Sequence, residues 1–286
     1  MGNSTTKVLC YADDALVFVH NVDDFYRVQL HMERYCAASN AKFNNSKVQA
    51  FSVSGRNIWD NWEEPLTGFH ISHLHSAEDN EPLIYLGFPL IQSRLQRINY
   101  VGSVVTKLKF AIQLHSSRSL SVVGKATVLN SLVLSKLWYI LRVTPLTQGD
   151  FHRIRSVAIQ FLRTNIFPVI PWQVWTTPKE HGGLGVLDIQ LQASALYFRW
   201  VHPLLIHDIA TIESHPVSYL LSFHLRQVNN CQFHHLPMLF PVSRTQGLKK
   251  QRTGTLEMLY RAADLLPRSF DLATINPATA MSLPLL

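Results

Sequence analysis

The sequence lacks three features that would place it in other protein classes. No apolar run reaches the roughly 18 residues of a transmembrane helix, and no apolar segment of a secretory signal peptide follows Met1. Its three cysteines, Cys10, Cys36 and Cys231, lie far apart and form no C-x-x-C pair. We therefore expect an intracellular protein that is not secreted, has no membrane partner and has no disulfide framework. Nucleus and cytoplasm both remain open.

Acidic residues are missing from one long segment. Pro82 to Gly149 contains no Asp or Glu, although the whole chain has a net charge of +7. The segment contains eight cations: Arg94, Arg97, Lys107, Lys109, Arg118, Lys125, Lys136 and Arg142. Charges of one sign repel each other unless they face a polyanion, and phosphate backbones are the usual one. The alternative is a helical region whose basic face is simply solvated.

The residues that are present predict an α+β protein. The stretch "VLCYADDALVFV", from Val8, reads as two β runs around an acidic turn, which predicts a hairpin with Asp13 and Asp14 at its tip. Asn21 is suited to begin a helix after it, and "IYLGFPLI" predicts a further short strand or a tight hairpin. Beyond about residue 100 the apolar spacing becomes helical. We expect N-caps at Ser121 and Asp150, and a third helix that begins at about Asp188 and ends at Pro203.

Six blocks, taken in order, resemble a known family. They are "YADD" in its hairpin, the helix after it, "SNAKFNNSK", "YLGFPL", "SLSVVGKATVLNSLVL" and "PKEHGGLGVLDIQLQASALYFRW". In this order they are similar to the reverse transcriptase of non-long-terminal-repeat (LINE-type) retrotransposons. The resemblance implies that residues 1–95 are the C-terminal part of a palm, an antiparallel hairpin sheet with a helix. Residues 96–205 are then a mainly helical thumb-like domain, and residues 206–286 are a helix and loop extension of unknown role.

The resemblance also implies a role for each matched residue. Asp13 and Asp14 are catalytic ligands of Mg²⁺, Asp13 being the stronger one, and Lys47 assists the leaving pyrophosphate. The nucleotide and primer contacts are Tyr11, Tyr85, Leu86 and Gly87. The expected partner is an RNA/DNA template-primer duplex, which the thumb follows through the cations Lys107, Lys109, Arg118, Lys125 and Lys136.

Two adjacent carboxylates do not hold two metal ions by themselves. Nucleotidyl transfer needs two ions about 4 Å apart, with ligands from more than one strand. In the family a further Asp comes from an upstream strand, whereas "MGNSTTKVLC" contains no acidic residue. We therefore expect a truncated reverse transcriptase that is inactive alone and retains nucleic-acid affinity. A separate chain that carries the fingers and upstream palm is a candidate partner, and the hairpin should present an uncovered edge.

Two other interpretations stay open. The chain is alternatively a non-catalytic nucleic-acid-binding module or a helical protein-interaction module. Two histidine-rich segments also invite a zinc interpretation: "HISHLH", with His70, His73 and His75, and "CQFHH", with Cys231, His234 and His235. Neither has a standard four-ligand spacing, and loop or surface histidines are the simpler explanation in a chain with 14 of them.

Overall fold

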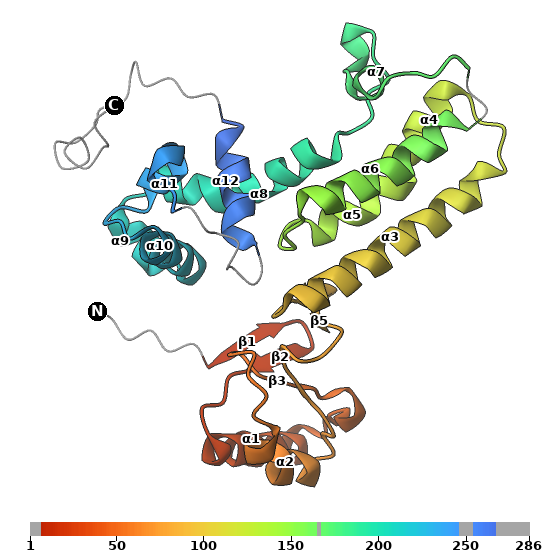
Figure 1. The fold of residues 1–286 in the computed structure, drawn as a ribbon. Coiled ribbons are helices and arrows are strands. Elements are labelled where there is room, and N and C mark those ends of the chain that lie inside the picture. The colour runs from red at the N-terminus through yellow and green to blue at the C-terminus, as the bar shows by residue number, and fades with distance from the viewer. Residues whose placement is uncertain (1–6, 165–166, 246–253, 267–286) are drawn as a thin grey trace. The chain divides into compact units, whose positions relative to one another are not determined.

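The computed structural model describes residues 7–164, 167–245 and 254–266 (Figure 1). Contacts divide the chain into two compact units, Met1–Asp79 and Asn80–Leu286. Together they confirm the expected α+β class, since short strands accompany a large helical region. The boundary between the units lies after Asp79, upstream of the boundary expected near residue 95, so the "YLGFPL" hairpin belongs to the second unit. The assignment of the ranges to palm, thumb and extension stays a prediction.

The first unit combines short strands with two helices. Its elements are β1 (Val8–Tyr11), β2 (Asp14–Val17), α1 (Val22–Ser39), the 3₁₀ helix η1 (Asn45–Lys47), β3 (Ala50–Phe51), α2 (Trp59–Gly68) and β4 (Leu74–His75). β1 and β2 form an antiparallel hairpin, and β3 pairs with β4 in parallel. Asn21 caps α1 as expected, because its side-chain oxygen accepts from Asp24 N at 2.8 Å.

The hydrophobic core of the first unit is small. It consists of Phe25, Leu66, Ile71 and Leu74, with aromatic side chains packed edge to face around Phe25. The β1–β2 hairpin stays outside this core. Within the described residues its sheet has these two strands only, and Val8 is 50% exposed. The uncovered sheet edge expected from the sequence is therefore confirmed for this part of the chain.

The second unit begins with a hairpin and continues as a helical assembly. Its elements are β5 (Leu83–Tyr85), β6 (Phe88–Leu90), α3 (Arg94–Ser116), α4 (Val122–Val128), the π-helical segment η2 (Leu129–Leu134), α5 (Ser135–Ile140), α6 (Gln148–Arg163), α7 (Trp172–Thr176), η3 (Lys179–His181), α8 (Ile189–Ile206), α9 (Ile209–Ser214), α10 (Pro216–Asn229), α11 (His235–Leu239), η4 (Pro241–Ser243) and α12 (Thr255–Asp264). None of the helices in the described ranges combines the length and the hydropathy that crossing a bilayer requires.

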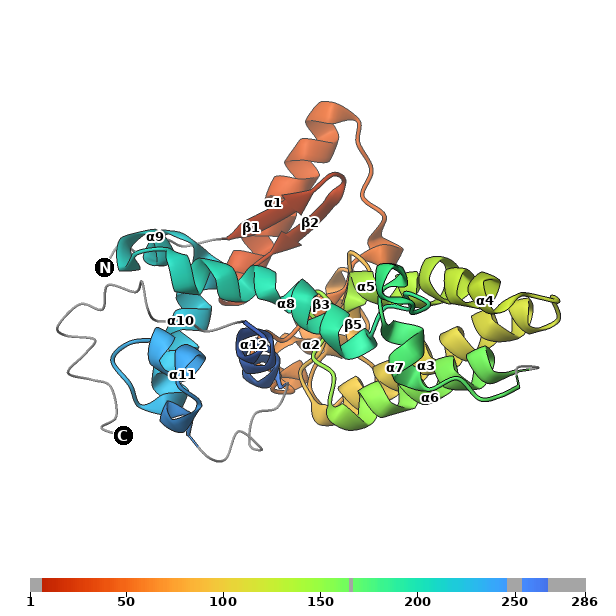
Figure 2. The ribbon, with the colours of Figure 1, turned by 90° about the horizontal axis from the view of Figure 1, so that it is seen from above.

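One continuous core holds the helices of the second unit together. α3 packs against α6, and α12 lies across α8 (Figures 1 and 2). The completely buried side chains include Leu129, Leu137, Phe161, Trp175 and Tyr197. The cap expected at Ser121 is confirmed, because its side chain accepts from Gly124 N, and the helices after it bury Leu129 and Leu137.

Two helix boundaries differ from the sequence expectation. Thr147, not Asp150, is the N-cap of α6; Asp150 lies three residues further on and closes a capping box. Asp188 does cap α8, but the helix continues past Pro203 to Ile206. A proline lacks only one backbone hydrogen bond, and the buried side chains of Val201 and Leu204 hold the last turn in the core.

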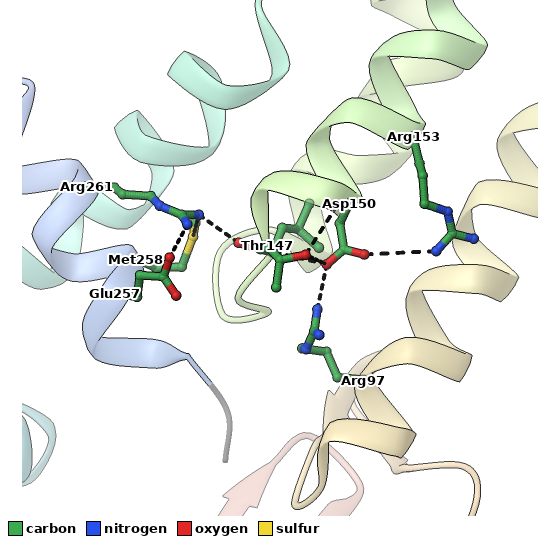
Figure 3. Close-up of polar contacts among 8 residues, drawn as sticks. Arg97, Thr147, Asp150, Arg153, Glu257, Met258 and Arg261 are labelled. Atoms are coloured by element: carbon green, nitrogen blue, oxygen red, sulfur yellow. Dashed lines mark hydrogen bonds and ion pairs between the residues drawn. The ribbon is translucent and has the colours of Figure 1, made fainter. Parts of the chain in front are cut away.

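Asp150 joins the two long helices α3 and α6 (Figure 3). Its Oδ2 accepts from Arg97 Nη1 at 2.5 Å, and both side chains are less than one tenth exposed. The same oxygen accepts from the backbone and the hydroxyl of Thr147, at 2.9 and 2.7 Å. Arg153 approaches Asp150 Oδ1 only at 4.0 Å and is half exposed. Arg261 on α12 donates to the carbonyl of Leu146 nearby.

Replacing Asp150 should destabilise the protein strongly. Asp150→Ala leaves the Arg97 guanidinium buried without its counter-ion, which costs about 3–5 kcal/mol. The matched control is Arg153→Ala, which removes the exposed neighbour and should change stability by less than about 0.5 kcal/mol. Urea unfolding followed by circular dichroism measures both. Equal midpoints for the two variants would show that the buried pair does not hold α3 to α6.

Candidate catalytic hairpin and nucleic-acid interface

The carboxylates of the first hairpin are presented to solvent. Tyr11 pairs with Asp14, so Ala12 and Asp13 form the two-residue turn. Ala12 has a φ of 53°, a left-handed conformation that costs a residue with a Cβ about 1–2 kcal/mol. Asp13 and Asp14 are both exposed, as is Tyr11 at 67%. Backbone strain of this kind clusters at functional turns, and here it fixes where the two carboxylates lie.

Asp13 and Asp14 offer carboxylate oxygens, a ligand type that Mg²⁺ accepts. Mg²⁺ accepts one or two carboxylates and completes its octahedron with waters or phosphate oxygens. Among the described residues, no third His, Cys, Asp or Glu gathers with Asp13 and Asp14. Lys47 lies at the end of η1, exposed, and no hydrogen bond or ion pair in the described ranges joins it to the hairpin. The described part of the chain therefore does not complete a two-metal site.

The second hairpin packs against α5 of its own unit. Leu86 and Gly87 have φ angles of 50° and 77°, so both residues of the turn are left-handed, as the twist of a two-residue hairpin favours. The hydroxyl of Tyr139, on α5, donates to the carbonyl of Leu86. Its ring stacks on Phe88 with 4.1 Å between ring centroids. Tyr85, Leu86 and Gly87 thus form one turn, held by α5.

The cations of the acid-free segment divide into two groups. Arg97 and Lys125 are buried, whereas six are exposed: Arg94, Lys107, Lys109, Arg118, Lys136 and Arg142. Within the described residues none of these six forms an ion pair. Unpaired cations that face solvent are available to phosphate groups, because no carboxylate must first be displaced.

Lys125 differs from the other cations proposed to contact nucleic acid. Its Nζ donates to the carbonyl of Thr164 and lies 5.9 Å from the centroid of the Phe161 ring. Burial lowers the pKa of its ammonium group. Together with Arg118 and His115, Lys125 lines a cavity of about 390 Å³. The structure thus places Lys125 between α4 and α6, where it has a packing role.

An exposed aromatic residue accompanies the cations on α3. Phe110 is 70% exposed and lies three residues after Lys107, so the two side chains occupy one face of the helix. Leu114, 62% exposed, continues this face. Sequence reasoning missed Phe110 because α3 has apolar residues on every side, and its buried face was not distinguishable. Exposed aromatic rings beside cations are the usual platform for nucleic-acid bases.

Two of the matched sequence blocks meet in space. Asn130, in "SLSVVGKATVLNSLVL", donates from Nδ2 to the carbonyl of Gly185 at 2.8 Å. Its Oδ1 accepts from the backbone N–H of Leu187 at 3.0 Å. Gly185 and Leu187 belong to the "PKEHGGLGVLD" loop that precedes α8. A single amide side chain therefore ties the loop to η2, across 55 residues of sequence.

Comparison with known proteins points to a transposable element. No protein-family model matches the chain. The chain is 29% identical over 209 residues to the "Transposon TX1 uncharacterized 149 kDa protein" of Xenopus laevis. The match covers 69% of this chain, which spans only 15% of the length of that relative. This similarity supports a transposon-derived origin for the chain.

The "CQFHH" segment serves the core of the second unit. His234 is buried, and its ring nitrogens contact Ser222 Oγ at 3.0 Å and the carbonyl of Leu204 at 2.8 Å. Burial lowers the pKa of His234. The thiol of Cys231 donates to the carbonyl of Phe233. Within the described residues these side chains form no ligand group, and His234 links α8, α10 and α11 through its two hydrogen bonds.

A methyl group at Gly87 should weaken the second hairpin. In Gly87→Ala an alanine must adopt the left-handed φ of 77°, and its Cβ lies 3.2 Å from Cε1 of the stacked Tyr139 ring. We therefore expect the free energy of unfolding to fall by about 1–2 kcal/mol. Gly102→Ala, in the interior of α3 with nothing within 4 Å, should instead stabilise by about 0.5–1 kcal/mol. Thermal unfolding measures both, and a shift of the same sign in both variants would refute the docked geometry.

Proposed function

We propose that this chain carries the C-terminal palm region and the thumb of a reverse transcriptase, an RNA-directed DNA polymerase of a LINE-type retrotransposon. In this proposal the second unit binds the template-primer duplex and the first presents Asp13 and Asp14. The observation that carries the proposal is the exposed Y-A-D-D turn. Both carboxylates lie at the tip of a tight hairpin whose conformation is strained at Ala12.

The charge distribution of the second unit supports duplex binding. Six exposed cations without ion-pair partners in the described ranges lie within a segment that has no acid. Each phosphate that such a cation neutralises releases counterions, which makes binding strong at low salt and weak at high salt. On α3, the neighbours Lys107 and Phe110 offer a phosphate contact and a stacking surface on one helical face.

The spatial relation of the matched blocks also supports the proposal. Asn130 ties the fifth block to the sixth, and Tyr139 ties α5 to the "YLGFPL" turn. The fifth and sixth blocks therefore hold each other through side-chain to backbone hydrogen bonds, and Tyr139, five residues after the fifth block, holds the fourth. The similarity to a transposon protein agrees with the same origin.

Polymerisation by this 286-residue chain alone is not part of the proposal. Asp13 and Asp14 offer oxygen ligands of the kind that Mg²⁺ prefers, and bound Mg²⁺ supplies charge stabilisation to phosphoryl groups. The described residues hold one such ion at most, since no third ligand is near. Fingers and an upstream palm strand with a further carboxylate would have to complete the site.

A second candidate function is nucleic-acid binding without catalysis. It rests on the same six exposed cations and needs no metal at the hairpin. The two candidates differ in whether primer extension, in the presence of fingers and an upstream palm, depends on Asp13. A helical protein-interaction module, the third interpretation, predicts no salt-dependent affinity for nucleic acid.

Removing cations from the second unit should weaken duplex binding. We expect Lys107→Gln/Lys109→Gln/Lys136→Gln to lower the affinity for an RNA–DNA duplex by about tenfold or more. The slope of log affinity against log salt should become shallower by about 3. Gel shifts at several salt concentrations measure both quantities.

The matched control removes the same total charge elsewhere. Lys42→Gln/Arg56→Gln/Lys179→Gln replaces exposed cations outside the acid-free segment and should leave the affinity within about twofold. Equal losses in the two triple variants would show that only net charge attracts the duplex. An affinity that does not fall as salt rises would contradict the proposed interface.

A further inference from the structure

Three metal-ligating side chains converge in the first unit, away from the Y-A-D-D turn. They are His73, which directly precedes β4, His75, which ends β4, and Asp79, four residues after His75. One ligand atom from each lies within 4.8 Å of the other two. His73 Nε2 is 3.1 Å from Asp79 Oδ2, and His75 Nδ1 is 3.7 Å from the same oxygen.

The local fold explains why these residues meet. Successive side chains of a strand point to opposite faces, so His73 and His75 share a face while Leu74 enters the core. β4 is fixed against β3, and Ser52 N donates to the carbonyl of His75 at 2.8 Å. Beyond β4 a turn reverses the chain, because Ser76 N donates to Asp79 Oδ2 at 2.8 Å. The turn brings the carboxylate back to the two imidazoles.

The distances suit a tetrahedral cation. Zinc binds nitrogen at about 2.0–2.1 Å and oxygen at about 2.0–2.2 Å, which places neighbouring tetrahedral ligands about 3.3 Å apart. The two distances to Asp79 Oδ2, 3.1 and 3.7 Å, lie on either side of that value. The imidazole rings meet nearly at right angles, with their centroids 4.7 Å apart.

One atom of the cluster needs a partner. His75 Nδ1 is buried, and no hydrogen bond satisfies it among the described residues. A buried polar atom without a partner is unfavourable, and a metal ion at this position would satisfy it.

We propose that His73, His75 and Asp79 form a zinc site. His73 Nε2, His75 Nδ1 and one oxygen of Asp79 are the protein ligands, and water fills the fourth position. The nitrogen ligands favour zinc over magnesium, so this site is distinct from the all-oxygen pair at the hairpin tip. Zinc here cross-links β4 to the turn after it, in a unit whose hydrophobic core is small.

The sequence alone suggests a different set of ligands, His70, His73 and His75, because all three lie in "HISHLH". In the structure the third member of the group is Asp79 and not His70. His70 has a φ of 63° in the turn before β4 and is exposed, outside the ligand group. This difference supplies a matched control for the experiment.

Cobalt titration of the full chain tests the site. Co²⁺ substitutes for Zn²⁺, and in a tetrahedral site it gives intense visible absorption. After chelator treatment, the protein should bind one equivalent of Co²⁺ with this absorption, and Zn²⁺ should displace it. His75→Ala and Asp79→Asn should each weaken Co²⁺ binding by about tenfold or more, since each removes one of three ligands. His70→Asn, which tolerates the left-handed φ, should bind as the unmodified chain does.

The outcomes separate a metal site from a hydrogen-bonded cluster. Circular dichroism first confirms that each variant folds, and a Zn²⁺-dependent rise in melting temperature should occur in the unmodified chain and in His70→Asn only. Absence of tetrahedral absorption in the unmodified chain would show that His73 and Asp79 form a hydrogen bond without metal. Binding that survives in both His75→Ala and Asp79→Asn would place the metal elsewhere and overturn the proposal.

Discussion

The ion pair between Arg97 and Asp150 is the constraint on which the second unit depends. It fixes the first turn of α3 to the first turn of α6, and it also completes the capping box of α6. Asp150 is the first acid after the acid-free segment that ends at Gly149. Its carboxylate neutralises the one arginine of that segment that is buried. The exposed cations of α3 and α5 therefore have no acidic competitor within their own segment and remain available to a polyanion.

Local signals in the sequence predicted local structure well. The first hairpin was predictable from β runs around a short turn, and Asn21 and Ser121 were recognisable as caps because an N-cap acts within three residues. Tertiary roles were not predictable in this way. Lys125 has the sequence context of an exposed cation, yet it lies between α4 and α6. Asp150 was expected as an N-cap, whereas it is the third residue of the capping box and also pairs with Arg97, 53 positions away.

The candidate sites show the same limit. Sequence patterns identified the turn with Asp13 and Asp14, because these two residues are neighbours in the sequence. They did not identify Asp79 as the companion of His73 and His75, since that grouping requires the turn after β4. They also missed Phe110, whose exposure depends on which face of α3 meets α6. A ligand set or an interface is a property of packed elements, and spacing in the sequence defines it only when all its members lie on one element.

The central proposal is that the Y-A-D-D hairpin is the metal-binding turn of a reverse-transcriptase palm. Primer extension on an RNA template, with Mg²⁺ and an added chain that carries the fingers and upstream palm of a LINE-type reverse transcriptase, tests it most directly. Extension should require both chains and should be lost when Asp13→Asn replaces the unmodified protein, while duplex binding persists. A duplex-bound mixture that never extends the primer, or extension that survives Asp13→Asn, would contradict the claim.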